Sequence, residues 1–230
     1  MKTLAIITAR GGSKRIPNKN IKLFLGKPII EYSIEAAIKS NCFDEIMVST
    51  DSKKIAQIAK DSGASVPFMR SKSNSGDYST TADVLIEVIN SYLKLGKEFD
   101  HVCCIYPTAP FLKAKTLKHA FKKLIDLNCK SVVPVVKFSF PILRSFKMEN
   151  EKLELNWPKY LNMRSQDLPN SYHDAGQFYF FRTDIFLQEK KVFTDNTYGI
   201  EMPETEVQDI DTPEDWTIAE MKYKISIKNE

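Results

Sequence analysis

The chain has 230 residues, 43% of them hydrophobic, so it is long enough to bury a sizeable core in one domain. Its 33 Lys and Arg residues against 29 Asp and Glu residues leave a formal net charge of +4. That excess is too small to indicate nucleic-acid or membrane binding. The first apolar run spans about six residues, too few for a secretory signal or a membrane span. We therefore expect one soluble domain over residues 1–230 that binds neither nucleic acid nor membrane.

The cysteine pattern indicates a reducing compartment. The four cysteines show no CxxC spacing, and Cys103 and Cys104 lie inside an apolar run typical of a buried strand. Reduced thiols in the core fit a cytoplasmic protein.

Short apolar runs rich in β-branched residues alternate along the chain with longer amphipathic segments. This alternation predicts an α/β fold, with βαβ units around a mainly parallel sheet and flanking helices. The predicted strands cover residues 3–8, 45–50, 101–106, 131–136 and 177–181, with a short one at 207–210. The predicted helices cover residues 28–39, 53–62, 80–95, 115–127 and 212–224, and in each the apolar residues recur at intervals of three and four.

One segment interrupts this rhythm. Between residues 143 and 158, polar and apolar residues alternate on either side of Glu149-Asn150, which is typical of a protruding β-hairpin. We expect this hairpin to form an arm over residues 138–170 that contacts a second copy of the chain.

A basic, glycine-rich loop over residues 9–20 follows the first predicted strand. Gly11 and Gly12 would let backbone N–H groups approach phosphate oxygens closely. Four positive charges in the loop would neutralise those oxygens: Arg10, Lys14, Arg15 and Lys19. The carboxyl end of a strand is also where open α/β sheets bind their ligands, which favours a polyphosphate site over a solvated basic loop. The loop contains neither a Walker A motif nor a GxGxxG turn.

An acidic pair, Asp209 and Asp211, lies near the end of the sequence. Residues two apart on an extended segment point to the same side, so both carboxylates can face one cation. Mg²⁺ prefers oxygen ligands and takes one or two carboxylates together with phosphate oxygens and water. The alternative is a pair of surface aspartates before a helix, since Thr212 and Pro213 suit the N-cap and first position of a helix.

Both ends of the sequence resemble the CMP-sugar synthetases, the acylneuraminate cytidylyltransferase family. The loop ARGGSKRIPNKN is similar to the family's nucleotide-binding signature, and VQDIDTPEDW is similar to its metal motif, DIDTxxD. The resemblance implies a single Rossmann-like nucleotide-diphospho-sugar transferase fold in which Asp209 and Asp211 bind Mg²⁺. It implies a CTP site made of Ala9, Arg10, Gly11, Gly12, Ser13, Lys14, Asn20, Arg70 and Thr80.

The middle of the chain resembles the family's sugar pocket. YPTAPF is similar to LQPTSPLR, and RSQDLP with YHDAGQFY is similar to RRQDLP with YxxNGAIY. Tyr106 replaces the usual Gln, Ser165 an Arg and Ala175 an Asn, so the pocket is less polar than in a sialic acid enzyme. The resemblance implies sugar contacts from Tyr106, Thr108, Arg144, Arg164, Gln166, Tyr172, Gln177 and Tyr179, with the 138–170 arm helping to form the pocket.

The reaction implied is attack by the anomeric 2-hydroxyl of a nine-carbon 2-keto-3-deoxy sugar acid on the α-phosphorus of CTP, with release of pyrophosphate. Arg10, Lys14 and Asp211 are the catalytic candidates. The motifs are most similar to those of members that act on pseudaminic acid, which would place the product in cell-surface glycan synthesis such as flagellin glycosylation, and the family implies a homodimer. Sialic and legionaminic acids remain alternatives, and so do two other classes, a DxD glycosyltransferase and a non-catalytic nucleotide-sugar binder.

Overall fold

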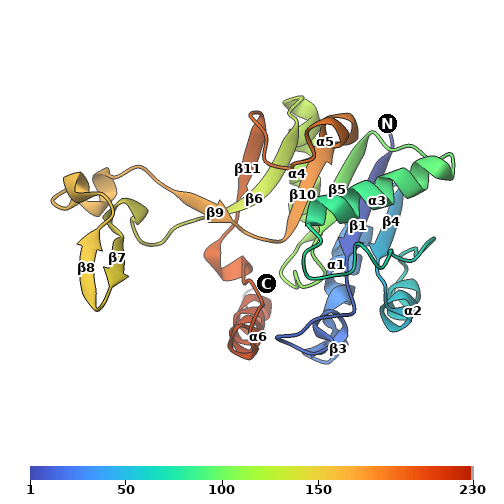
Figure 1. The fold of residues 1–230 in the computed structure, drawn as a ribbon, viewed down its shortest axis with the longest axis horizontal. Coiled ribbons are helices and arrows are strands. Elements are labelled where there is room, and N and C mark those ends of the chain that lie inside the picture. The colour runs from blue at the N-terminus through green and yellow to red at the C-terminus, as the bar shows by residue number, and fades with distance from the viewer. Residues whose placement is uncertain (229–230) are drawn as a thin grey trace.

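A seven-stranded sheet forms the centre of the molecule in a computed structural model that describes residues 1–228 (Figure 1). Its strands are β1 (Thr3–Thr8), β4 (Glu45–Ser49), β5 (His101–Ile105), β6 (Ser131–Lys137), β9 (Tyr172–Asp174), β10 (Phe178–Arg182) and β11 (Thr197–Glu201). Their order is β11-β6-β10-β5-β1-β4, with β9 beside β6. Strand β10 is antiparallel to both β5 and β6, so β4, β1, β5, β6 and β11 share one direction. The prediction of an α/β fold with a mainly parallel sheet is confirmed, and β9 and β10 make the sheet mixed.

Helices cover both faces of this sheet. One layer contains α1 (Ile29–Ser40), α2 (Lys53–Asp61) and α4 (Ala114–Asp126), and the other contains α3 (Thr81–Lys94) and α5 (Thr183–Glu189). Because successive side chains of a strand point to opposite faces of the sheet, the core is divided between the two helical layers. On β1, Ala5 and Ile7 pack in the first layer and Leu4 and Ile6 in the second, all four fully buried. Among residues 1–228, no helix is long and apolar enough to cross a membrane.

The last helix, α6 (Pro213–Lys228), packs outside both layers. It lies against a two-stranded ribbon of β2 (Leu23–Phe24) and β3 (Lys27–Pro28), which follows the basic loop and the short 3-10 helix η1 (Lys19–Ile21). The hydroxyl of Thr212 accepts a hydrogen bond from the N–H of Asp215, and the Asp215 carboxylate accepts one from the N–H of Thr212. This reciprocal cap confirms the predicted start of the helix.

The predicted strand at 207–210 is wrong. These residues form no strand pairing and follow the 3-10 helix η5 (Glu204–Glu206). The buried side chains of Val207 and Ile210, which suggested a strand, pack into two different apolar clusters. Pro28 is the N-cap of α1 rather than part of its first turn.

The predicted hairpin is confirmed, with its turn one residue later than the predicted Glu149-Asn150. Strands β7 (Phe146–Glu149) and β8 (Lys152–Leu155) are joined by Asn150 and Glu151, whose φ angles of 48° and 65° fit a type I′ turn. The arm also contains the short helices η2 (Ile142–Arg144), η3 (Pro158–Tyr160) and η4 (Ser165–Asp167). In Figure 1 the hairpin stands well away from the central sheet, so its side chains are presented to the outside.

Candidate active site

A cleft runs along the sheet edge where β1 and β5 end. Its three parts are here called the loop pocket, the Arg70 pocket and the Tyr179 pocket, with volumes of about 210, 240 and 480 Å³. Thr8 and Arg10 line both the loop pocket and the Arg70 pocket, and Tyr106 lines both the loop pocket and the Tyr179 pocket. The three parts therefore form one continuous site, at the edge where open α/β sheets bind ligands.

The loop pocket contains most of the predicted phosphate-binding residues. Arg10, Ser13, Lys14 and Asn20 line it together. Asn20 is only 5% exposed, and its Nδ2 donates a hydrogen bond to the carbonyl oxygen of Arg10 (2.9 Å). The buried amide thus holds the start of the loop in place, with a role in positioning the loop backbone.

The two glycines of the loop have different environments. The N–H of Gly11 donates to Asp51 Oδ1 (2.8 Å), and a Cβ at Gly11 would lie 3.1 Å from the Cβ of Ser52. A larger residue there would push the loop away from the N-terminus of α2. A Cβ at Gly12 would meet nothing within 4 Å, so the Gly12 backbone faces open space that a ligand can enter.

Arg10 and Lys14 converge on one carboxylate. Arg10 Nη1 lies 2.8 Å from Asp77 Oδ1, and Lys14 Nζ contacts Asp77 Oδ2. The hydrogen bond from Lys14, and then that from Arg10, lowers the pKa of Asp77. Two cations that share one anionic group are placed to bind an anion with several oxygens, which is the chemistry of a polyphosphate.

The Arg70 pocket is lined by Arg70 and Thr80, as the CTP prediction requires. Arg70 is 8% exposed, and it donates from Nε to Ser49 Oγ (3.0 Å) and from Nη2 to the Ser49 carbonyl oxygen (2.6 Å). Burial lowers the pKa of Arg70. Thr80 caps α3 by a reciprocal pair of hydrogen bonds with Asp83. Ala9, also predicted to contact CTP, is fully buried in the core, and its N–H donates to the carbonyl oxygen of Ser49.

The acidic pair flanks a buried side chain. Ile210 is 1% exposed and packs in an apolar cluster with Ile16 of the basic loop. Asp211 Oδ1 lies 2.9 Å from Arg15 Nη2 and 3.3 Å from Lys19 Nζ, so the acidic pair and the basic loop meet. Burial, followed by the charge of Asp211, raises the pKa of Asp209, which lines the Tyr179 pocket.

These two carboxylates fit a hard cation. A partly buried carboxylate beside a like charge is stabilised when a cation lies between the two. Within the described part of the chain, no group of three or more His, Cys, Asp or Glu side chains forms a closed metal site. Mg²⁺ does not require one, because phosphate oxygens and water complete its coordination.

The predicted sugar contacts fall into two groups. Tyr106, Thr108 and Tyr179 line the cleft. Gln177 is 3% exposed, and its Nε2 donates to the carbonyl oxygen of Glu206 (2.7 Å), so it supports the segment before the acidic pair. Tyr172 lies on β9 with 43% of its surface exposed, outside the residues that line the cleft.

The remaining predicted contacts lie in the arm. Arg144 Nη1 donates to the carbonyl oxygen of Met163 (3.1 Å), and Arg164 pairs with Asp167 (2.6 Å). Gln166 is in η4. Within residues 1–228, no residue of the 138–170 arm lines any of the three pockets.

The sequence analysis did not predict the contact of Arg15 and Lys19 with Asp211, and it gave Asp174 no role. Arg15 and Lys19 were visible as loop charges, but their partner Asp211 is almost 200 positions away, at a separation of 192 for Lys19. Asp174 lines the Tyr179 pocket and accepts a hydrogen bond from Tyr179 Oη (2.6 Å). Asp174 lies within YHDAGQFY, but at a position that the family pattern YxxNGAIY leaves variable, so the resemblance gave it no role.

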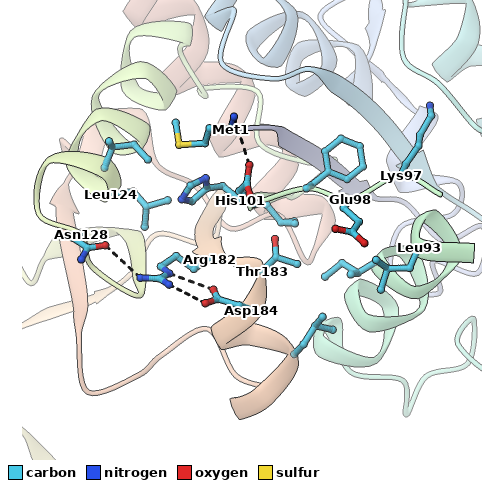
Figure 2. Close-up of a pocket in the computed structure, with 16 residues that line it drawn as sticks. Met1, Leu93, Lys97, Glu98, His101, Leu124, Asn128, Arg182, Thr183 and Asp184 are labelled. Carbon is cyan, nitrogen blue, oxygen red and sulfur yellow. Dashed lines mark hydrogen bonds and ion pairs between the residues drawn. The ribbon is translucent and has the colours of Figure 1, made fainter. Parts of the chain in front are cut away.

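A cavity of about 880 Å³ lies at the opposite end of β5, and Figure 2 shows the side chains that line it. Arg182 and Asp184 pair with each other there (2.8 Å), and Arg182 also donates to Asn128. None of the predicted site residues within 1–228 lines this cavity. Its paired charges and its position at the start of the parallel strands make it a poorer site for a polyphosphate than the cleft.

Comparisons with known proteins show the family of the chain. A family model described as Cytidylyltransferase matches residues 4–226. A pseudaminic acid cytidylyltransferase of Campylobacter jejuni is 43% identical over 227 residues, 98% of each chain. A CMP-N,N'-diacetyllegionaminic acid synthase of Legionella pneumophila is 35% identical over 229 residues, again 98% of each chain. The solved structure of CMP:2-keto-3-deoxy-manno-octonic acid synthetase complexed with CTP has a similar fold, with a TM-score of 0.70 at 17% identity over 99% of this chain and 100% of that one.

The role of Asn20 can be tested by one substitution. Asn20→Asp replaces the N–H donor with a carboxylate facing the Arg10 carbonyl oxygen, so we expect the loop to shift and the affinity for CTP to fall by about tenfold or more. Isothermal titration calorimetry with CTP measures this. Asn18→Asp makes the same chemical change at an exposed position two residues away, where the Asn side chain caps nothing. Equal losses in both variants would contradict the positioning role of Asn20.

Proposed function

The chain belongs to the cytidylyltransferase family, and from that premise we propose that it transfers CMP from CTP to the anomeric 2-hydroxyl of pseudaminic acid, releasing pyrophosphate. The observation that carries this proposal is the meeting of Arg15 and Lys19 with Asp211. It joins a basic loop suited to a polyphosphate with an acidic pair suited to a metal ion. The Tyr179 pocket adjoins both and has room for a second substrate.

The loop would bind and activate the triphosphate. We propose that Arg10 and Lys14 exchange Asp77 for phosphate oxygens, and that Ser13 and the Gly12 backbone orient the leaving pyrophosphate. Positive charge next to the leaving group stabilises the negative charge that builds up on it as the bond to the α-phosphorus breaks. Because these groups are already held in one place, little reorganisation is needed when the reaction begins.

We propose that Asp209 and Asp211 hold Mg²⁺, which when bound would compensate charge on the phosphate oxygens. Arg15 and Lys19 both contact Oδ1 of Asp211. Among residues 1–226, no hydrogen bond or ion pair reaches its Oδ2, which is therefore the oxygen available to a cation. The charge of Lys19 acts against the rise in the pKa of Asp209, so it helps to keep that carboxyl ionised.

Pseudaminic acid is the sugar acid that the comparisons favour. The Campylobacter jejuni relative that acts on it is 43% identical to this chain, whereas the Legionella pneumophila relative that makes a CMP-legionaminic acid is 35% identical. Tyr106, Val136 and Ala175 contribute apolar and aromatic groups to the otherwise polar lining of the Tyr179 pocket. Such a surface suits a sugar that carries acyl groups in place of some hydroxyls.

The activity is tested by pyrophosphate release from CTP with Mg²⁺. We expect release with pseudaminic acid, and at least about tenfold lower kcat/KM with sialic, legionaminic or 2-keto-3-deoxyoctonic acid. ATP, GTP and UTP serve as controls for the nucleotide. Faster release with another of these acids would support the proposed reaction but show that a different acid is the preferred substrate. Absence of release with every acid would leave the glycosyltransferase and non-catalytic binder as the readings to test.

The acidic pair is tested by Asp211→Ala. Losing one of two metal-binding carboxylates should lower kcat by at least about a hundredfold, because the charge on the phosphates is no longer compensated. Asp195→Ala is the matched control, since the Asp195 side chain is 81% exposed and pairs only with Lys130 among the described ion pairs. Circular dichroism shows whether each variant is folded. A folded Asp211→Ala variant with normal turnover would refute the metal assignment.

We propose that the arm joins two copies of the chain in a homodimer. Met148 and Leu153 face each other across the hairpin and are 69% and 63% exposed. Exposed apolar side chains on a protruding element are typical of a protein interface. In such a dimer Arg144, Arg164 and Gln166 would reach the partner's cleft, which would explain why they lie outside the cleft of their own chain.

Light scattering after gel filtration tests the dimer. We expect a mass of twice 26.3 kDa for the native chain and of one chain for Met148→Glu/Leu153→Glu, because two buried charges are costly in an apolar interface. Leu95→Glu changes a side chain that is 60% exposed at the end of α3, far from the hairpin in sequence, and should remain dimeric. A native chain that is monomeric at micromolar concentration would refute the proposal.

A further inference from the structure

We propose that Asp174, held in place by Tyr179, determines the sugar specificity of the enzyme by accepting a hydrogen bond from an acylamido N–H of the substrate. This inference rests on the proposed function, because it concerns the sugar acid that enters the Tyr179 pocket. It gives a role to a residue that falls on a variable position of the YHDAGQFY motif and that the comparisons do not identify.

The carboxylate of Asp174 is fixed on both of its oxygens. Asp174 is the last residue of β9, and its Oδ1 accepts from the N–H of Gly176 (2.9 Å) while its Oδ2 accepts from Tyr179 Oη (2.6 Å). Among the side chains of residues 1–226, none forms an ion pair with Asp174. Each carboxylate oxygen can accept two hydrogen bonds, so each has capacity for one more. Asp174 is exposed and lines the pocket, so a bound sugar can supply that donor.

The hydrogen bond from Tyr179 fixes the orientation of the Asp174 carboxylate. The Tyr179 ring is 5% exposed, and burial, followed by the neighbouring Tyr106 and Asp174, raises its pKa far above the usual value. The phenol therefore remains protonated and donates a hydrogen bond to Asp174. Tyr106 packs edge-on against Tyr179, with ring centroids 5.5 Å apart. The carboxylate is thus presented next to an aromatic wall that cannot easily move.

The charges of the pocket decide which part of the substrate can approach Asp174. Asp174, Glu204 and Asp209 all line it, with Lys222 as the one lysine or arginine among its lining residues in the described chain. Like charges repel strongly in a partly enclosed site, so the carboxylate of the sugar acid and the phosphates of CTP are excluded from the position next to Asp174. A neutral N–H or O–H donor remains.

The apolar surface distinguishes between these two donors. Val136 and Ala175 line the same pocket as Tyr106 and Tyr179, so the acceptor has apolar groups beside it. An acylamido group combines an N–H donor with a methyl group or longer acyl chain and satisfies both features. A hydroxyl can donate to the Asp174 acceptor, but it has no apolar group to pack against the apolar residues beside it. Curated relatives named for N,N'-diacetyllegionaminic acid and N-acylneuraminate show that acylated amino sugars occur as substrates among similar proteins.

The substitution Asp174→Asn tests this inference because a carboxylate only accepts hydrogen bonds, whereas an amide also donates them. The Gly176 N–H still needs an acceptor at the Oδ1 position, so the new amide nitrogen takes the place of Oδ2, where Tyr179 Oη can accept from it. At the Oδ2 position next to Tyr179, where we propose that the acylamido N–H binds, the site then presents a donor in place of an acceptor. A sugar hydroxyl can accept from that donor, but an acylamido N–H cannot.

We expect Asp174→Asn to lower kcat/KM for pseudaminic acid by about 10- to 100-fold, mainly through KM. For a nine-carbon 2-keto-3-deoxy acid with hydroxyls in place of the acylamido groups, the expected change is less than about threefold, and the KM for CTP stays the same. Glu204→Gln is the matched control, because it removes one negative charge from the same pocket and should affect both acids alike. Tyr179→Phe frees the Asp174 carboxylate and should cause a smaller loss with the same preference.

The failures of the two proposals can be told apart. If the native enzyme releases no pyrophosphate with any sugar acid, the proposed function is refuted, and this inference with it. Suppose instead that the native enzyme is active. If Asp174→Asn then loses activity equally with both acids, or loses no activity with either acid, only the role of Asp174 is refuted. Should Asp174→Asn fail to bind CTP because it is misfolded, Tyr179→Phe alone decides, and an unchanged ratio between the two acids would overturn the inference.

Discussion

The packing of Ile210 against the basic loop is the contact on which the site depends. Ile210 and Ile16 share one apolar cluster with Phe24 and Trp216, and Lys19 donates from Nζ to the Ile210 carbonyl oxygen (2.6 Å) across 191 positions of sequence. Burying an apolar side chain of this size contributes about 1.5–3 kcal/mol. That contact fixes the segment on which both aspartates lie, so a hydrophobic interaction sets the geometry of a polar site.

Ion pairs keep the cleft ordered before any ligand binds. Asp77 pairs with Arg10 and Lys14, and Asp211 pairs with Arg15 and Lys19. Most of these side chains are partly exposed, so each pair adds little to stability. Their effect is to hold four cations within one basic loop near the positions that an anion would occupy. A triphosphate can replace the Asp77 carboxylate at Arg10 and Lys14 with little rearrangement.

The sequence predicted well those features that depend on local periodicity or on chain order. The strand at 3–8 alternates cleanly between two buried faces, and the basic loop directly follows it, so its place at the carboxyl edge was predictable. Strand β9 has three residues and β11 contains Gly199 and the exposed Tyr198, which are too few or too mixed for an alternation to be seen. The arrangement of Gln177 was not predictable either, because its partner is the Glu206 backbone, and a backbone partner leaves no pattern in the sequence.

The charges of the Tyr179 pocket connect the arm to the site. An acidic sugar must enter a space lined by Asp174, Glu204 and Asp209, where Lys222 already donates to the carbonyl oxygen of Val207 (2.9 Å). A metal ion would offset the charge of Asp209, and a neutral donor would satisfy Asp174 as a hydrogen-bond acceptor, but the carboxylate of the sugar would still need a cationic partner. In the proposed dimer the arginines of the partner's arm would supply that charge. The arm would then complete the electrostatics of the pocket as well as the interface, which gives a physical reason for an arm that stands so far from the central sheet (Figure 1).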